Sequence, residues 1–142
     1  MRSYLIVANQ TLTSESLREA ISARLADGPL RAHVVVPMSA GAGRLSWDDE
    51  GKSRATAQAR LEEMLERLKE MGVEADGEVG DRDPVNAVRD AMRRQEVDEV
   101  IVSTLPRGLS RWLGEDVPSR LRDSCRVPVT VVSQPSTEKA SA

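Results

Sequence analysis

Aromatic residues are nearly absent from this 142-residue chain, which has no Phe, one Tyr and two Trp. Its core must therefore consist of Val, Leu, Ile, Ala and Met. Proteins that stack bases on their surface need several aromatic rings, so this composition argues against that mode of nucleic-acid binding. The formal net charge of -3 likewise lacks the basic excess of a general nucleic-acid binder. We expect no nucleic-acid partner.

Cysteine and histidine occur once each, as Cys125 and His33. A single cysteine excludes an internal disulfide and a multi-cysteine metal site, and a single histidine excludes a histidine-rich one. His33 lies inside an expected strand, where it is predicted to be packed or at an edge and unable to serve a serine hydrolase. Cys125, at the end of an expected helix, is predicted to be a small buried apolar group. We predict no catalytic residue and no metal site.

Long apolar runs are also missing. The first one, residues 4–8, spans five residues. It is too short for the apolar region of a signal peptide and far too short for a membrane span. We expect a cytoplasmic protein that makes no contact with membranes.

Short β-branched runs alternate with helical patterns along the chain. Strands are expected at residues 4–8, 33–36, 73–79, 97–103 and 129–132. Helices are expected after Thr13 or Ser14, over 52–71, from Pro84 with Asp83 as N-cap, and from Val117 or Pro118 to Ser124. This alternation predicts a single-domain α/β fold over residues 1–133, in which a doubly wound parallel sheet of five strands carries helices on both faces.

The segments outside these elements carry three further expectations. Ser39–Gly51 reads as a long loop that holds Trp47 and is either mobile or a lid. Residues 134–142 form a Ser/Thr/Pro/Lys tail that is expected to be disordered. Arginines of the last expected helix read as a solvated face: Arg120, Arg122 and Arg126.

Several local sequences occur in an order that resembles the universal stress protein family over about residues 3–133. They are Ile6-Val-Ala-Asn-Gln-Thr11, Gly80-Asp-Arg-Asp-Pro84, Asp98-Glu-Val-Ile-Val-Ser103 and Cys125-Arg-Val-Pro-Val-Thr-Val-Val132. The resemblance implies the strand order 3-2-1-4-5. It also implies a homodimer, in which Val129–Val132 pairs with its counterpart across a two-fold axis. The alternative is a monomer whose last strand is covered by the tail or a helix.

The ATP-binding pattern of the family is Gly-x-x-Gly, nine residues, then Gly-Ser or Gly-Thr. Glycines in such a loop let backbone N–H groups approach phosphate oxygens. Here Leu105 stands three residues before Gly108, and Pro118-Ser119 stands where Gly-Ser is expected. Asn9 replaces the usual acidic residue, and Glu115 and Asp116 near the helix start would repel a triphosphate. The chain thus reads as a divergent member without the full glycine motif, and no cofactor is expected.

Nucleotide binding by other means stays open. Candidate binding residues, by resemblance, are Asn9, Gly80, Arg107, Gly108 and Ser110. Arginine forks can hold phosphate without a glycine-rich loop, and Arg82, Arg107 and Arg111 lie in two loops expected to meet. The alternative is that these arginines are solvated or pair with Asp81, Glu115 and Asp116. We predict a non-enzymatic, stress-related regulatory or interaction module; the second hypothesis is a sensor of ATP or AMP.

Overall fold

The computed structural model describes residues 1–8, 15–38, 47–80, 83–104 and 117–133, and gives the backbone alone for 47–53, 104 and 133. The elements follow one another as strands and helices in alternation. They are β1 (Arg2–Ala8), α1 (Glu15–Leu25), β2 (Leu30–Pro37), α2 (Trp47–Glu70), β3 (Glu74–Gly80), α3 (Pro84–Arg94), β4 (Glu99–Thr104), α5 (Val117–Ser124) and β5 (Val129–Ser133).

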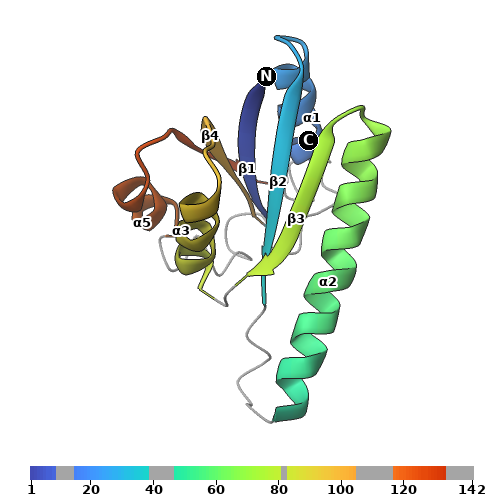
Figure 1. Cartoon of the computed structure of the whole chain (residues 1–142), viewed down its shortest axis with the longest axis vertical. Coiled ribbons are helices and arrows are strands. Elements are labelled where there is room, and N and C mark those ends of the chain that lie inside the picture. The colour runs from blue at the N-terminus through green and yellow to red at the C-terminus, as the bar shows by residue number, and fades with distance from the viewer. Residues whose placement is uncertain (9–14, 39–46, 81–82, 105–116, 134–142) are drawn as a thin grey trace, which may run out of the picture.

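The five strands form one sheet in the order β3-β2-β1-β4-β5, and every adjacent pair is parallel. Figure 1 shows α2 on one side of this sheet and α3 with α5 on the other. The predicted fold class and strand order are confirmed. A parallel sheet covered on both faces explains why its strands read as continuous apolar runs.

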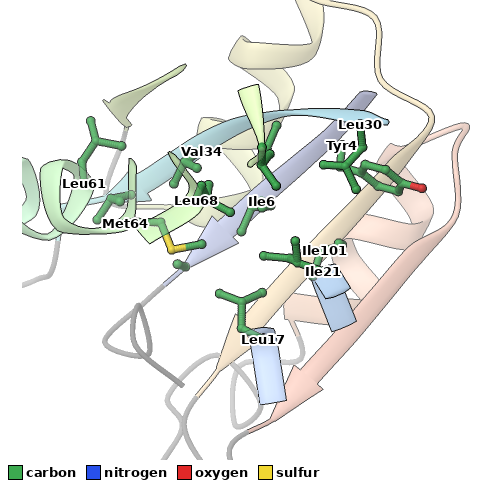
Figure 2. Close-up of a cluster of buried hydrophobic side chains, with 14 of the residues drawn as sticks. Tyr4, Ile6, Leu17, Ile21, Leu30, Val34, Leu61, Met64, Leu68 and Ile101 are labelled. Atoms are coloured by element: carbon green, nitrogen blue, oxygen red, sulfur yellow. The ribbon is translucent and has the colours of Figure 1, made fainter. Parts of the chain in front are cut away.

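Two aliphatic cores flank the sheet because alternate residues of each strand point to opposite faces. On one face, Ile6 and Ile101 pack with residues of α1 and α2 such as Leu17 and Met64 (Figure 2). On the other face, Leu5 packs with α3 and α5. Both layers are filled mainly by aliphatic side chains, but the core also contains Tyr4, which is 3% exposed, so the expectation of a core without aromatic residues is wrong at this position.

The main departure from the sequence prediction is the start of α2. The helix begins at Trp47, so the expectation that Ser39–Gly51 is a loop is wrong for residues 47–51. Residues 39–46 lie outside the described part. The acidic run Asp48-Asp49-Glu50 suits a helix N-terminus, where negative charge is favourable, and this outweighs the cost of Gly51. The first turns of α2 extend beyond the end of β3 (Figure 1).

The helix α2 packs directly on the backbone of the edge strand β3. A Cβ atom at Gly77 would lie 2.5 Å from the Val34 carbonyl oxygen and 2.6 Å from Leu61 Cδ1. A residue without a side chain is therefore required where helix and strand meet. Among the described helices, none combines the length and apolar character needed to cross a membrane.

Candidate functional site

The candidate site lies at the carboxyl edge of the sheet, between β1 and β4. The connection after β1 runs over one face through α1, whereas the connection after β4 runs over the other through α5. Ligands of open α/β sheets bind at such a switch point. Ala8 and Ser103 are register partners there, and both are fully buried.

Four of the five predicted binding residues, Asn9, Arg107, Gly108 and Ser110, lie outside the described residues, as do Arg82 and Arg111. The strand ends that lead to Asn9 and to residues 105–116 are neighbours in the sheet. Gly80, by contrast, ends β3, which β2 separates from β1. The described backbone therefore brings the strand ends at Ala8 and Ser103 together at the switch point, but places Gly80 at the far edge strand.

Gly80 has a packing reason to be glycine. A Cβ atom there would lie 2.7 Å from Ala87 Cβ and 2.9 Å from Val35 Cγ1. The carbonyl of Gly80 accepts a hydrogen bond of 3.2 Å from the Met38 amide. Close packing of α3 on the sheet accounts for this glycine, and a role in ligand binding stays a prediction.

The start of α3 is stabilised by Asp83, as the sequence predicts. The Asp83 carboxylate accepts a 2.9 Å hydrogen bond from the Val85 amide and another of 2.9 Å from Arg120. Burial disfavours the charged carboxylate, but these hydrogen bonds outweigh it and lower the pKa of Asp83. Arg120 lies on the exposed face of α5, as expected, and its ion pair with Asp83 also connects α5 to the start of α3. Asp83 already supplies the negative charge that a helix N-terminus favours.

The two edge strands of the sheet differ in chemistry. Val129, Thr130, Val131 and Val132 of β5 are half-buried, and within the described part of the chain β5 pairs with β4 alone. The other edge, β3, is acidic: it carries Glu74, Asp76 and Glu78.

A polar network that the sequence did not reveal joins α1, β4 and β5. Arg24 donates to Glu99 at 2.7 Å and 3.1 Å, and Thr130 donates to the same carboxylate. Burial disfavours ionised Glu99, but the hydrogen bonds from Arg24 and Thr130 outweigh it and lower its pKa. The Arg24 guanidinium also lies over the Tyr4 ring, 5.7 Å from its centroid. Residues so far apart in sequence give no local signal of this contact.

His33 is packed inside β2, as expected, with 6% of its surface exposed. Both of its ring nitrogens face carboxylates of β3, a contact that sequence reasoning also missed. Cys125 is half-buried rather than fully buried, and its burial raises the pKa of its thiol. Across the described residues, no set of three His, Cys, Asp or Glu side chains is arranged to hold a metal ion.

We compared the chain with models of protein families and with solved structures. The model of the universal stress protein family matches residues 9–133. Among solved structures, a protein of this family from Burkholderia pseudomallei is similar, with a TM-score of 0.58 and 19% identity over 91% of this chain and 94% of the other. A family protein from Arabidopsis thaliana with AMP bound has a TM-score of 0.59 and 18% identity over 96% and 94%.

A universal stress protein from Archaeoglobus fulgidus has a TM-score of 0.59 and 16% identity over 93% of each chain. No curated protein sequence matches this chain. At these identities the solved structures establish the shared fold, whereas the family model covers most of the sequence itself. The chain belongs to the universal stress protein family.

Proposed function

We propose that this chain is a non-enzymatic, stress-related regulatory or interaction module. In this proposal it forms a homodimer through Val129–Val132 of β5 and does not bind ATP in the manner usual for its family. The contrast between the two edge strands carries the proposal. The module would act in the cytoplasm, since the single Cys125 gives no sign of an oxidising compartment.

The β5 edge is suited to pairing with a second copy. Three of its described side chains, Val129, Val131 and Val132, are aliphatic, and none of its five residues is charged. In a parallel ladder, alternate residues of a strand bond to the same neighbour, so an edge strand presents free backbone groups on its outer side. An apolar edge of this kind is an aggregation hazard unless it is covered. Antiparallel pairing across a two-fold axis covers both copies at once.

The β3 edge is unsuited to the same pairing. The side chains of Glu74 and Asp76 are 64% and 65% exposed. Two copies of β3 would bring like charges together, which destabilises strand pairing. Charges on an edge strand are a common means of preventing such contacts. Self-association is therefore expected at β5 and not at β3.

Two matched variants test this interface, because Val131 of β5 and Val79 of β3 are both half-buried valines on edge strands. Sedimentation equilibrium should find a dimer for the natural chain and for Val79→Glu, and a folded monomer for Val131→Glu. A folded Val131→Glu dimer would refute the β5 interface. If either variant fails to fold, hydrogen exchange of the natural chain decides. Protection of the β5 amides should then rise with protein concentration while that of β3 does not, and a rise in neither contradicts the proposal.

The departure from the glycine motif supports the absence of ATP binding in the family's usual manner. Leu105 and Pro118 stand where the pattern has glycines, and Glu115 and Asp116 add negative charge nearby. Chromatography of the supernatant from the purified, denatured protein should find no adenine nucleotide. Stoichiometric nucleotide in that supernatant would overturn this part of the proposal.

The second candidate function is a nucleotide sensor. It is favoured by the similar Arabidopsis protein, whose structure contains AMP. In this chain the binding residues would be Asn9, Gly80, Arg107, Gly108 and Ser110. Arg107 is the most informative position, because an arginine fork can replace glycine-rich backbone as a phosphate ligand. Nucleotide binding that Arg107→Ala abolishes would establish this candidate in place of the first.

A further inference from the structure

A cavity of about 340 Å³ opens at the amino-terminal edge of the sheet, below the carboxyl end of α3. It lies at the opposite edge from the candidate nucleotide site. The imidazole of His33, on β2, lines it and is 7% exposed. The cavity connects an otherwise buried titratable group to solvent.

Three side chains compete for the two ring nitrogens of His33. Nε2 lies 2.7 Å from Glu78 Oε2, and Nδ1 lies 2.9 Å from Asp76 Oδ1. The side-chain nitrogen of Gln95 also lies 2.9 Å from Nδ1. A protonated Nδ1 donates and suits the carboxylate of Asp76; an unprotonated Nδ1 accepts and suits the NH₂ group of Gln95. One protonation state cannot serve both partners in the geometry shown.

Glu78 keeps the other nitrogen occupied in both states. Burial disfavours its charged form, but hydrogen bonds from Arg94 and His33 outweigh burial and lower the pKa of Glu78. The carboxylate is therefore ionised near neutral pH and accepts from Nε2–H. Protonation of the ring then changes the bonding at Nδ1 alone.

We propose that His33 is a proton-operated switch that exchanges partners between Asp76 and Gln95. When the ring is doubly protonated, Nδ1–H donates a hydrogen bond to Asp76, and this bond links β2 to the edge strand β3. When that proton leaves to solvent, the lone pair of Nδ1 accepts a hydrogen bond from the side-chain amide of Gln95. This bond links β2 to the end of α3 instead. Gln95 is the C-cap of α3, so the exchange moves a hydrogen bond from the sheet to the helix.

The charges around the ring bias the switch in opposite directions. The carboxylates of Asp76 and Glu78 favour the protonated ring, and so does the negative charge of Glu96, which also lines the cavity. The guanidinium groups of Arg31 on β2 and Arg94 on α3 disfavour it. Arg94 is paired with Glu78, and Arg31 lies 3.9 Å from Glu74.

His33 is the sole histidine of the chain, so its ring nitrogens can be assigned without ambiguity by ¹⁵N NMR. As the pH is raised, Nε2 should remain protonated while Nδ1 loses its proton. Asp76→Asn keeps an amide oxygen but removes the negative charge that favours the protonated ring, and it should therefore lower the titration midpoint. Gln95→Ala removes the donor of the unprotonated state and should raise the midpoint. Glu19→Gln, at an exposed position of α1, should leave it unchanged.

The opposite signs distinguish a switch from a structural contact, which would give no such pair of shifts. Shifts of both variants in one direction, or no shift in either, would overturn the proposal. If a variant fails to fold, the natural chain still decides. The Gln95 side-chain amide signals should titrate together with His33, and their failure to do so contradicts the exchange of partners.

Discussion

Replacement of Gly80 by alanine separates a packing role of this glycine from a role in ligand approach. The added Cβ atom would lie 2.7 Å from Ala87 Cβ and 2.9 Å from Val35 Cγ1, closer than real Cβ atoms essentially ever approach. Overpacking of this kind costs about 1–3 kcal/mol. The smaller conformational entropy of an unfolded chain with alanine offsets about 0.4–1 kcal/mol. Gly80→Ala should therefore lower the free energy of unfolding by about 1.3 kcal/mol, the difference between the middles of these two ranges.

A second substitution checks the named contact. Ala87→Gly removes the nearer of the two obstructing atoms, but costs about 1 kcal/mol as a glycine within α3. In Gly80→Ala/Ala87→Gly the total loss should be smaller than the sum of the single losses by about 0.5–1.5 kcal/mol. Because Val35 Cγ1 would still lie 2.9 Å from the added Cβ atom, Ala87→Gly should restore only part of the stability lost in Gly80→Ala.

Urea denaturation without nucleotide gives all four free energies, provided that the four chains share one m-value. A glycine needed only for ligand approach would leave stability unchanged in this assay. A loss below about 0.5 kcal/mol for Gly80→Ala, or strict additivity in the double variant, would refute the packing explanation.

Three further predictions concern the carboxylates of Glu99 and Asp83 and the thiol of Cys125. Hydrogen bonds from Arg24 and Thr130 outweigh the burial of Glu99 and hold its pKa below 4.5, so Glu99→Gln should cost about 1–2 kcal/mol at neutral pH. The difference in free energy of unfolding between the natural chain and Glu99→Gln should be complete above the pKa of Glu99 in the unfolded chain. It should vanish as the pH falls through the lower pKa of Glu99 in the folded protein. Urea denaturation at neutral pH and at acidic pH measures both limits. Asp83→Ala should cost about 1 kcal/mol by the same assay, and Arg120→Ala less, because their ion pair is partly exposed. Burial raises the pKa of Cys125 above 9.0, so its thiol should react with a disulfide reagent more slowly than free cysteine until urea unfolds the protein.

The fold was largely predictable because its signals are local. Residues 4–8 and 33–36 are apolar on both faces, which is typical of central parallel strands, and Asp83-Pro84 marks a helix start. The start of α2 was missed because Gly51 follows a polar segment that resembles a loop. The acidic residues before it, Asp48 to Glu50, favour a helix N-terminus and were the available signal.

The polar contacts were less predictable because they depend on neighbours in the sheet. Glu99 meets Arg24 and Thr130 only after strand order and register are fixed. The cluster at His33 had a partial signal: Asp76 and Glu78 are two residues apart on one strand and therefore share a face. Pairing that face with His33 required the register of β2 and β3. Four predicted binding residues, Asn9, Arg107, Gly108 and Ser110, lie outside the described residues, so they remain predictions from sequence.

Titration calorimetry of ATP with Mg²⁺ into the nucleotide-free protein tests the proposed function most directly. A divergent interaction module with Leu105 and Pro118 in place of motif glycines should give no saturable heat at micromolar ATP. Saturable micromolar binding that is lost in Arg107→Ala would contradict the proposal and identify the chain as a nucleotide sensor.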